Sequence, residues 1–151
     1  MKIALDTTIL VRANEHANGL ARELLTCIIE GGHTLLISSE VLHELARVLR
    51  YPRLQTLYRL DETDVFNYVG FLLQSSSVVV LNPLIMAPIR DINDVIVMQT
   101  AIIGEADVLC SNDDDFFNLP ASEYLTKLGI EVLDDVSLMH RLRSQHPLRQ
   151  W

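Results

Sequence analysis

The chain has 151 residues, of which 49% are hydrophobic and 21% are charged, and its formal net charge is −8 at pH 7. This length and composition are typical of one globular domain with its own core, and they argue against a disordered or fibrous chain. The acidic excess argues against broad nucleic-acid binding through a basic surface, although arginines gather at two places. No apolar run reaches the length of a membrane span, and Asp6 interrupts the apolar N-terminus, so we expect neither a membrane segment nor a signal peptide.

Short apolar runs alternate with helical patterns along the chain. We expect strands at residues 2–5, 33–38, 77–81, 106–111 and 130–134. Helical spacing is found at residues 20–30, 38–50, 62–74, 94–104, 122–129 and 136–143. Gly31 and Gly32 are typical of a helix end, and Pro52 prevents the second helix from continuing. Asp61 and Asp64 have the spacing of a capping box at the start of the third helix.

The order of these elements predicts the fold class. Wholly apolar strands that alternate with helices are typical of an α/β protein whose parallel sheet is covered on both faces. We therefore expect a three-layer α/β/α sandwich with a central parallel sheet of about five strands. A single domain should span residues 1–143, and residues 144–151 should form a C-terminal tail.

The two cysteines, Cys27 and Cys110, each lie within an apolar run. This placement predicts buried free thiols, and it indicates neither a disulfide framework nor a zinc site. The expected compartment is therefore a reducing one, the cytoplasm.

Acidic residues stand near the ends of several predicted strands. Asp6 ends the first strand, residues 113–115 are three aspartates that follow the fourth, and Asp91 and Asp94 stand before a long helix. In open parallel sheets the working site lies beyond the carboxyl ends of the strands, so these side chains are expected to converge there. A lone carboxylate in such a place is most often a cap, but several in a partly dry cleft repel one another without a cation. Oxygen ligands alone favour Mg²⁺ or Mn²⁺ over zinc.

Glu44 is a less obvious member of this acidic set. It lies at the border of the apolar stripe of the helix at 38–50, from which it could reach past the sheet edge. Glu40 lies further round the helix and is expected to face solvent. A competing interpretation makes Glu44 a surface carboxylate that pairs with Arg47, three residues further on.

Four motifs in this order resemble those of the PIN domain family. They are "LDTTIL" at the first strand, "SSEVLHELARVL" on the second helix, "RDINDVIVMQTAI" at a later helix and "CSNDDDF" after the fourth strand. Each motif alone is weak, but together they are fairly specific, and the similarity covers nearly the whole chain. It is greatest to bacterial PIN proteins described as toxins of toxin–antitoxin pairs.

The resemblance implies a ribonuclease that uses Mg²⁺ or Mn²⁺ to hydrolyse phosphodiester bonds of single-stranded RNA. The catalytic acids that it implies are Asp6, Glu44, Asp94 and Asp113. The metal ligands would be Asp6, Asp94, Asp113 and Asp115, binding directly or through water. Supporting residues would be Thr7, Thr8, Asp91 and Ser111. Asp6→Asn is then expected to abolish cleavage while the fold survives.

The chain departs from the family pattern at two positions. The family usually has "DTN" at the first strand, whereas Thr8 stands in place of the asparagine and lacks its paired donor and acceptor. This leaves open a second function, a PIN-fold module that binds RNA or protein with little or no catalysis. In the turn after the fourth strand the usual glycine is Asn112, which tolerates positive φ better than most residues.

Two other families also gather acids at strand ends. A signalling receiver domain needs an acidic pair after its first strand and a lysine after its last, whereas here Asp6 stands alone and "IEVLDD" is not followed by lysine. A haloacid-dehalogenase-type phosphatase needs a second aspartate at the position of Thr8. Both families fit this sequence less well than the PIN family does.

The expected partners are single-stranded RNA, an antitoxin that fills the acidic groove, and a second copy of the chain. Candidates for contact with the RNA backbone are Arg47, Arg50 and Arg53, and a solvated helix face is the competing interpretation. A homodimer surface is one interpretation of Leu84, Ile85 and Met86 or of residues 141–151, and ordinary loop packing is the other.

The three consecutive aspartates are expected to differ in role. Asp113 should point into the cleft, and Asp115 should cap a following short helix or hold a metal-bound water. Asp114 should point away into solvent. Phe116 and Phe117 are expected to anchor the turn in the core.

Overall fold

The centre of the computed structural model, which describes residues 1–145, is a parallel sheet of five strands in the order β3-β2-β1-β4-β5. The strands are β1 (Lys2–Leu5), β2 (Thr34–Ser38), β3 (Ser77–Val79), β4 (Val108–Cys110) and β5 (Glu131–Leu133). Every residue of β1 and β2 after the first is buried, as expected for strands covered on both faces. The predicted five-stranded parallel sheet is therefore confirmed, although β3 and β4 are shorter than the apolar runs that predicted them.

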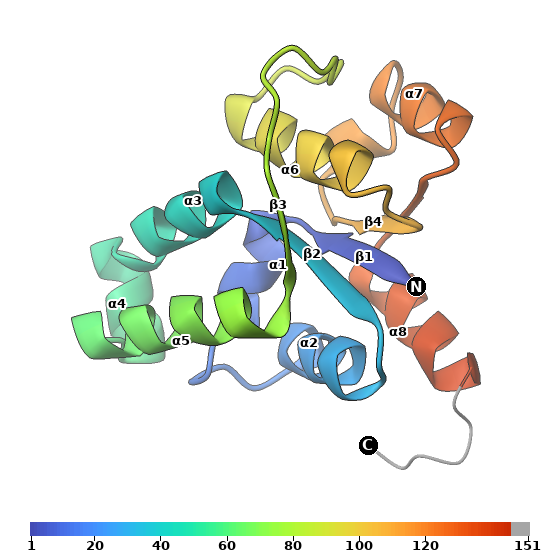
Figure 1. Ribbon diagram of the computed structural model, residues 1–151. Helices are drawn as coiled ribbons and strands as arrows, with labels where there is room; N and C mark the ends of the chain where they lie inside the picture. The colour runs from blue at the N-terminus through green and yellow to red at the C-terminus, as the bar shows by residue number, and fades with distance from the viewer. Residues whose placement is uncertain (146–151) are drawn as a thin grey trace.

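Helices fill the connections between the strands. They are α1 (Thr7–Arg12), α2 (Leu20–Glu30), α3 (Ser39–Leu49), α4 (Pro52–Tyr58), α5 (Glu62–Ser75), α6 (Ile92–Ile103), α7 (Ala121–Lys127) and α8 (Asp135–Gln145), with a 3-10 turn, η1 (Asp114–Phe116). Figure 1 shows α6 and α7 on one face of the sheet and α2 and α8 on the other. The three-layer α/β/α sandwich is thus confirmed. Among residues 1–145, no helix has the length and apolar character that a bilayer span requires.

Helix α8 continues to Gln145, so the predicted tail begins inside this helix. Residues 146–151, which make up the rest of that predicted tail, lie outside the described residues.

Two helices, α1 and α4, were not predicted. Helix α1 follows β1 at once, and its β-branched Thr7 and Thr8 weaken the local helix signal. In α4, Pro52 occupies the first turn, where a missing N–H costs nothing because that group has no partner inside the helix. The proline that prevents α3 from continuing therefore also begins α4, which ends at Arg59 in the left-handed conformation with φ 54°.

Polar side chains fix where the other helices begin. The Ser38 hydroxyl accepts a hydrogen bond from the Val41 amide at 3.3 Å, which starts α3 at the end of β2. The Asp91 carboxylate accepts one from the Asn93 amide at 2.7 Å, which starts α6. These caps satisfy N–H groups that have no partner within the helix. The predicted capping box at the start of α5 is also present.

The core lies between the sheet and the two helical layers. Cys27 and Cys110 are buried free thiols, as predicted. Phe116 is fully buried below the turn that follows β4, whereas Phe117 is 41% exposed. The prediction for Phe117 was therefore wrong, because the 3-10 turn directs two consecutive side chains to different sides.

The strand order determines where polar side chains meet. The chain runs outward from β1 to β2 and β3, and then crosses back to β4 on the other side of β1. At such a reversal the connections leave in opposite directions and open a crevice beyond the strand ends. Asp6 follows β1 there, and its amide donates to the Cys110 carbonyl of β4 at 2.9 Å. The acidic segments after β1 and β4 therefore meet at this switch point.

Candidate active site

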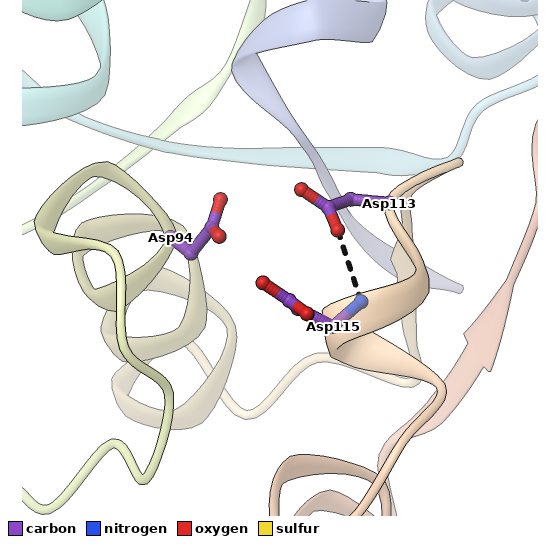
Figure 2. A group of neighbouring side chains, drawn as sticks. All are labelled: Asp94, Asp113 and Asp115. Carbon is purple, nitrogen blue, oxygen red and sulfur yellow. Dashed lines mark hydrogen bonds between the residues drawn. The ribbon is translucent and has the colours of Figure 1, made fainter.

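Three carboxylates from two distant segments point toward one another (Figure 2). Asp94 lies in the first turn of α6, and Asp113 and Asp115 lie in the turn after β4. One oxygen atom of each lies within 4.8 Å of the others. Two oxygens bound to one Mg²⁺ at about 2.1 Å can be at most about 4.2 Å apart, so small side-chain rotations bring all three to bonding distance. This donor set fits the hard cation that the resemblance implies.

Asp6 is joined to this group of three through Ser111. The Ser111 hydroxyl donates to Asp6 Oδ2 at 2.7 Å, and Ser111 Oγ in turn accepts a hydrogen bond from the Asp113 amide at 3.0 Å. Ser111 therefore orients the Asp6 carboxylate and fixes the turn that carries Asp113. Asp6 itself is not among the three converging oxygens.

Burial and mutual repulsion raise the pKa of the innermost acids. Asp94 is only 9% exposed, and burial raises its pKa from the ordinary 3.8 to about 7, with a further contribution from four neighbouring aspartates. Burial also raises the pKa of Asp6, although the hydrogen bond from Ser111 opposes this effect. Without a cation, Asp94 therefore keeps its proton to a much higher pH than an ordinary aspartate does. A bound divalent cation would favour the charged form of these groups.

The three consecutive aspartates have different surroundings. The Asp115 amide donates to Asp113 Oδ1 at 2.9 Å, so the side chain that caps the 3-10 turn is that of Asp113 and not that of Asp115 (Figure 2). Asp114 is exposed and lines a separate pocket together with Asp134 and Asp135. Only the first and third aspartates thus contribute to the group of three.

Asn112 does not adopt the left-handed conformation of the glycine that it replaces. Among residues 1–145, the non-glycine residues with positive φ are Arg59 and Glu105. The Asn112 side chain instead accepts a hydrogen bond from the Asp135 amide at 3.1 Å. It therefore ties the turn after β4 to the first residue of α8.

Glu44 reaches the same cavity and is also paired with Arg47. Two guanidinium nitrogens of Arg47, Nε and Nη2, donate to Glu44 Oε2 at 2.9 Å and to Oε1 at 2.7 Å. The third nitrogen donates to the Tyr51 hydroxyl. Both interpretations of Glu44 therefore describe part of its environment, since it lines the cavity and its charge is compensated.

The carboxylates open into a cavity of about 590 Å³. Its acidic part is lined by Asp6, Glu44, Asp91, Asp94 and Asp113, with Thr7 and Thr8 beside them. The Thr7 hydroxyl is buried without a hydrogen-bond partner among the described residues. A second part of the lining was not singled out from the sequence, and consists mainly of Arg12, Tyr51, Leu54, Leu57 and Tyr58.

The three arginines considered for the RNA backbone differ in position. Arg53 lines the cavity, and within residues 1–145 no ion pair engages it. Arg47 is engaged by Glu44, and Arg50 pairs with Glu62 at 3.0 Å on the surface. Arg53 is thus the best placed of the three to meet a phosphate.

Arg12 lines the cavity as well, and it pairs with the buried Asp135 of α8 at 3.3 Å. Sequence reasoning missed it because α1 was not expected. Its spacing from Asp6 gives no signal of its own, because residues six apart on a helix do not share a face.

The loop between β3 and α6 carries exposed apolar side chains. Leu84 is 90% exposed and Met86 is 64% exposed. The side-chain amide of Gln99 donates to the Ile85 carbonyl at 3.0 Å, so the loop backbone is held against α6. The homodimer surface stays a prediction.

Comparisons with known proteins agree with this geometry. A PIN domain family model matches residues 2–115. No curated protein sequence matches the chain significantly. A chain in the crystal structure of VapBC2 from Rickettsia felis, bound to a DNA fragment from their promoter, is 18% identical with a TM-score of 0.57, and the alignment covers 89% of this chain and 98% of that one. At this identity the likeness concerns the fold alone. Because the family model spans most of the chain, the protein belongs to the PIN domain family.

Proposed function

We propose that this PIN domain is an endoribonuclease that depends on Mg²⁺ or Mn²⁺ and cleaves single-stranded RNA. The observation that carries the proposal is the convergence of Asp94, Asp113 and Asp115 within 4.8 Å beside a cavity that the first two of them line. Asp6, hydrogen-bonded to Ser111, completes the acidic set. Membership of the PIN family supports a nuclease, because this family resemblance is the one that implied metal-dependent RNA cleavage.

The cation would be held by Asp94, Asp113 and Asp115, with Asp6 contributing directly or through water. When bound, it supplies a more acidic water and neutralises the negative charge that grows on the phosphate during hydrolysis. Histidine, the commonest general base, is absent from the lining of the described cavity. The carboxylates of the chain therefore carry the chemistry together with the cation.

The remaining residues prepare the site for a substrate. Ser111 orients Asp6, and the Asp91 cap fixes the start of α6 and with it the position of Asp94. Arg47 neutralises Glu44, which reduces repulsion of an incoming phosphate. A cavity of about 590 Å³ beside the carboxylates admits an unpaired nucleotide, whereas bases in a duplex are stacked and paired. This supports single-stranded over double-stranded RNA.

The direct test is cleavage of a fluorescent single-stranded RNA in the presence of Mn²⁺. We expect EDTA to stop the reaction and a duplex of the same sequence to resist it. Asp114→Asn is a matched control, because Asp114 is exposed and points away from the site; it should retain activity within about twofold. Cleavage that continues at full rate in EDTA would exclude the metal-dependent reaction.

Arg53→Met is expected to weaken binding of single-stranded RNA by removing one phosphate contact. The slope of log Kobs against log salt concentration should then become less steep by about 0.7, the value for one contact with a single strand. Arg50→Met is the matched control, since Arg50 pairs with Glu62 outside the cavity and should leave the slope unchanged. Equal slopes for the wild type and Arg53→Met would show that Arg53 does not contact an RNA phosphate.

The proposal extends to a toxin that pairs with an antitoxin in the cytoplasm. Its support is the motif resemblance to bacterial PIN toxins and the shared fold with VapBC2, which is described bound to promoter DNA. The antitoxin would cover the cavity, with a basic side chain against the carboxylates. Induced expression should arrest growth, and co-expression of the antitoxin should restore it.

A binding module without catalysis is the second candidate. It is favoured by Thr8, which lines the cavity where the family usually has asparagine. Such a module would retain single-stranded RNA without shortening it, so the same fluorescent assay separates the two functions.

A further inference from the structure

The cavity has two chemically different walls. One is acidic and contains Asp94 and Asp113, whereas the other is formed by α4 and the tyrosine before it and contains Tyr51, Leu54 and Leu57. The two walls meet at Glu44, which lines the cavity and is joined through Arg47 to the Tyr51 hydroxyl. A molecule in this cavity therefore meets carboxylates at one end and an aromatic ring at the other.

The ring of Tyr51 is held in place from two directions. Its backbone is extended, with φ −61° and ψ 131°, and the following Pro52 restricts it to this region. The guanidinium carbon of Arg47 lies over the ring at 5.3 Å from its centroid, a cation–π distance. Arg47 is not among the residues that line the described cavity, so the surface that Tyr51 presents to the cavity is not covered by it. Tyr51 nevertheless remains 43% exposed.

We propose that Tyr51 is a stacking platform for one nucleobase next to the scissile phosphate, and that Arg47 is the positioning residue that holds it. This inference rests on the proposed function and adds to it the contact that fixes the register of the RNA. A fixed, half-exposed aromatic ring beside a phosphate-cleaving centre suits a flat base, because every base offers a π-face. Arg53 at the same cavity would meet the backbone of that nucleotide.

A nucleobase fits these observations better than an apolar peptide side chain. A peptide anchor needs a closed apolar pocket, whereas here the ring is joined to charged Arg47 and Glu44, which favour a polar, flat partner. The same contacts explain why Arg47 is poorly placed as a phosphate ligand, since three of its nitrogens already donate.

The test measures kcat/KM on a set of single-stranded RNA oligonucleotides in which one nucleotide at a time is abasic. For the wild type, the abasic change at one position near the cut should lower kcat/KM by about 5- to 150-fold, the range expected for one stacked base. Tyr51→Ala should lower kcat/KM on intact RNA by a similar factor. The abasic change at that position should then cause no further loss in the variant. Tyr51→Phe should keep most of the wild-type sensitivity to that abasic position, because it keeps the ring and the guanidinium over it and loses only the hydroxyl that accepts from Arg47.

Phe66→Ala is the matched control, because Phe66 is a more exposed aromatic residue that does not line the cavity. It should behave as the wild type, and melting curves should show that all variants fold. If the abasic change lowers kcat/KM of Tyr51→Ala by the same factor as that of the wild type, the two losses are independent. This result would overturn the platform. Unchanged RNA cleavage by Tyr51→Ala would also overturn it.

Arg47→Lys tests the positioning residue, because it keeps the positive charge and loses the fork that holds Glu44 and Tyr51. The abasic change should lower kcat/KM of Arg47→Lys by a smaller factor than that of the wild type. The slope of log Kobs against log salt concentration should be the same for both proteins. If the abasic sensitivity of Arg47→Lys equals that of the wild type, Arg47 does not position the ring.

Failure of the nuclease proposal is visible separately. If the wild type does not cut RNA, the same set of oligonucleotides is measured by binding, through fluorescence anisotropy. If the abasic change weakens binding to the wild type but not to Tyr51→Ala, the platform is supported in a module that binds without cutting. Additive losses, or no RNA binding at all, overturn it.

Discussion

Asp94→Asn is expected to abolish RNA cleavage and, in the same molecule, to make the metal-free protein more stable at pH 8. The asparagine removes one of the three converging carboxylates, and loss of one electrostatic contact at a reacting centre typically lowers kcat by about 10²- to 10³-fold. It also removes a buried negative charge that four other aspartates repel. Function and stability should therefore change in opposite directions at this one position.

The stabilising effect of Asp94→Asn should depend on pH in a defined way. The pKa of Asp94 is about 7 in the folded protein and has its ordinary value of 3.8 when the chain is unfolded. The folded state therefore holds this proton more tightly, and the stability that it contributes is complete below about pH 4 and is lost as the pH rises through 7. The asparagine is neutral at every pH, so the variant keeps at pH 8 the stability that the wild type has only when Asp94 is protonated. The two proteins should melt together at low pH and separate progressively up to about pH 7.

Thermal unfolding in EDTA between pH 4 and pH 8 measures this separation. A gain of 1 kcal/mol corresponds to about 2–4 °C in Tm for a protein of this size, so a difference of a few degrees is readily resolved. Asp114→Asn provides the comparison, since it removes the same charge from an exposed neighbour outside the group of three. A variant of Asp94 that melts below the wild type at pH 8 would show that its carboxylate stabilises the fold, contrary to the expected repulsion.

Divalent cations are expected to raise the Tm of the wild type substantially. A ligand that binds only the folded state at 100 times its Kd stabilises that state by about 2.7 kcal/mol. At about 2–4 °C for each kcal/mol, the Tm should rise by roughly 5–10 °C. The cation would also keep Asp94 ionised, so the dependence of stability on pH described above should shrink as Mg²⁺ or Mn²⁺ is added.

Two controls separate this effect from general screening of a chain whose net charge is −8. Sodium chloride at matched ionic strength should produce a much smaller shift than Mg²⁺ does. Asp113→Asn should lose most of the Mg²⁺-dependent shift, because Asp113 is one of the three converging carboxylates. Equal shifts in sodium and magnesium, or an undiminished shift in Asp113→Asn, would argue against a specific site.

The sheet could be predicted from sequence because its strands are short, apolar and buried on both faces. At β2 the consecutive apolar residues Leu35, Leu36 and Ile37 predict a strand that is covered on both faces, and all three are buried. Helices α1 and α4 could not be predicted in this way, since their stability comes from packing and their local signals conflict. Pro52 was interpreted as a stop, although the same residue is favourable in the first turn of a helix.

The acidic side of the site was also accessible to sequence reasoning, because parallel strands bring their carboxyl ends to one edge. Asp6 and Asp113 follow neighbouring strands, and Ser111 links them. The other wall was not accessible, because Tyr51 belongs to the site only through the placement of α4 and the contact with Arg47. A tyrosine before a proline has no distinguishing pattern of its own.

The ion pair between the partly exposed Arg12 and the buried Asp135 joins one wall of the cavity to the last helix. The segment that identifies the family ends at residue 115, yet β5 covers the edge of β4, and Asp135 lies beyond that segment. A protein shortened to residue 115 would retain the carboxylates of the candidate site but would leave Arg12 without its partner and the edge of β4 open. The folded unit that supports the site is therefore longer than the segment that identifies the family, and a shortened version of the protein has to keep β5 and α8.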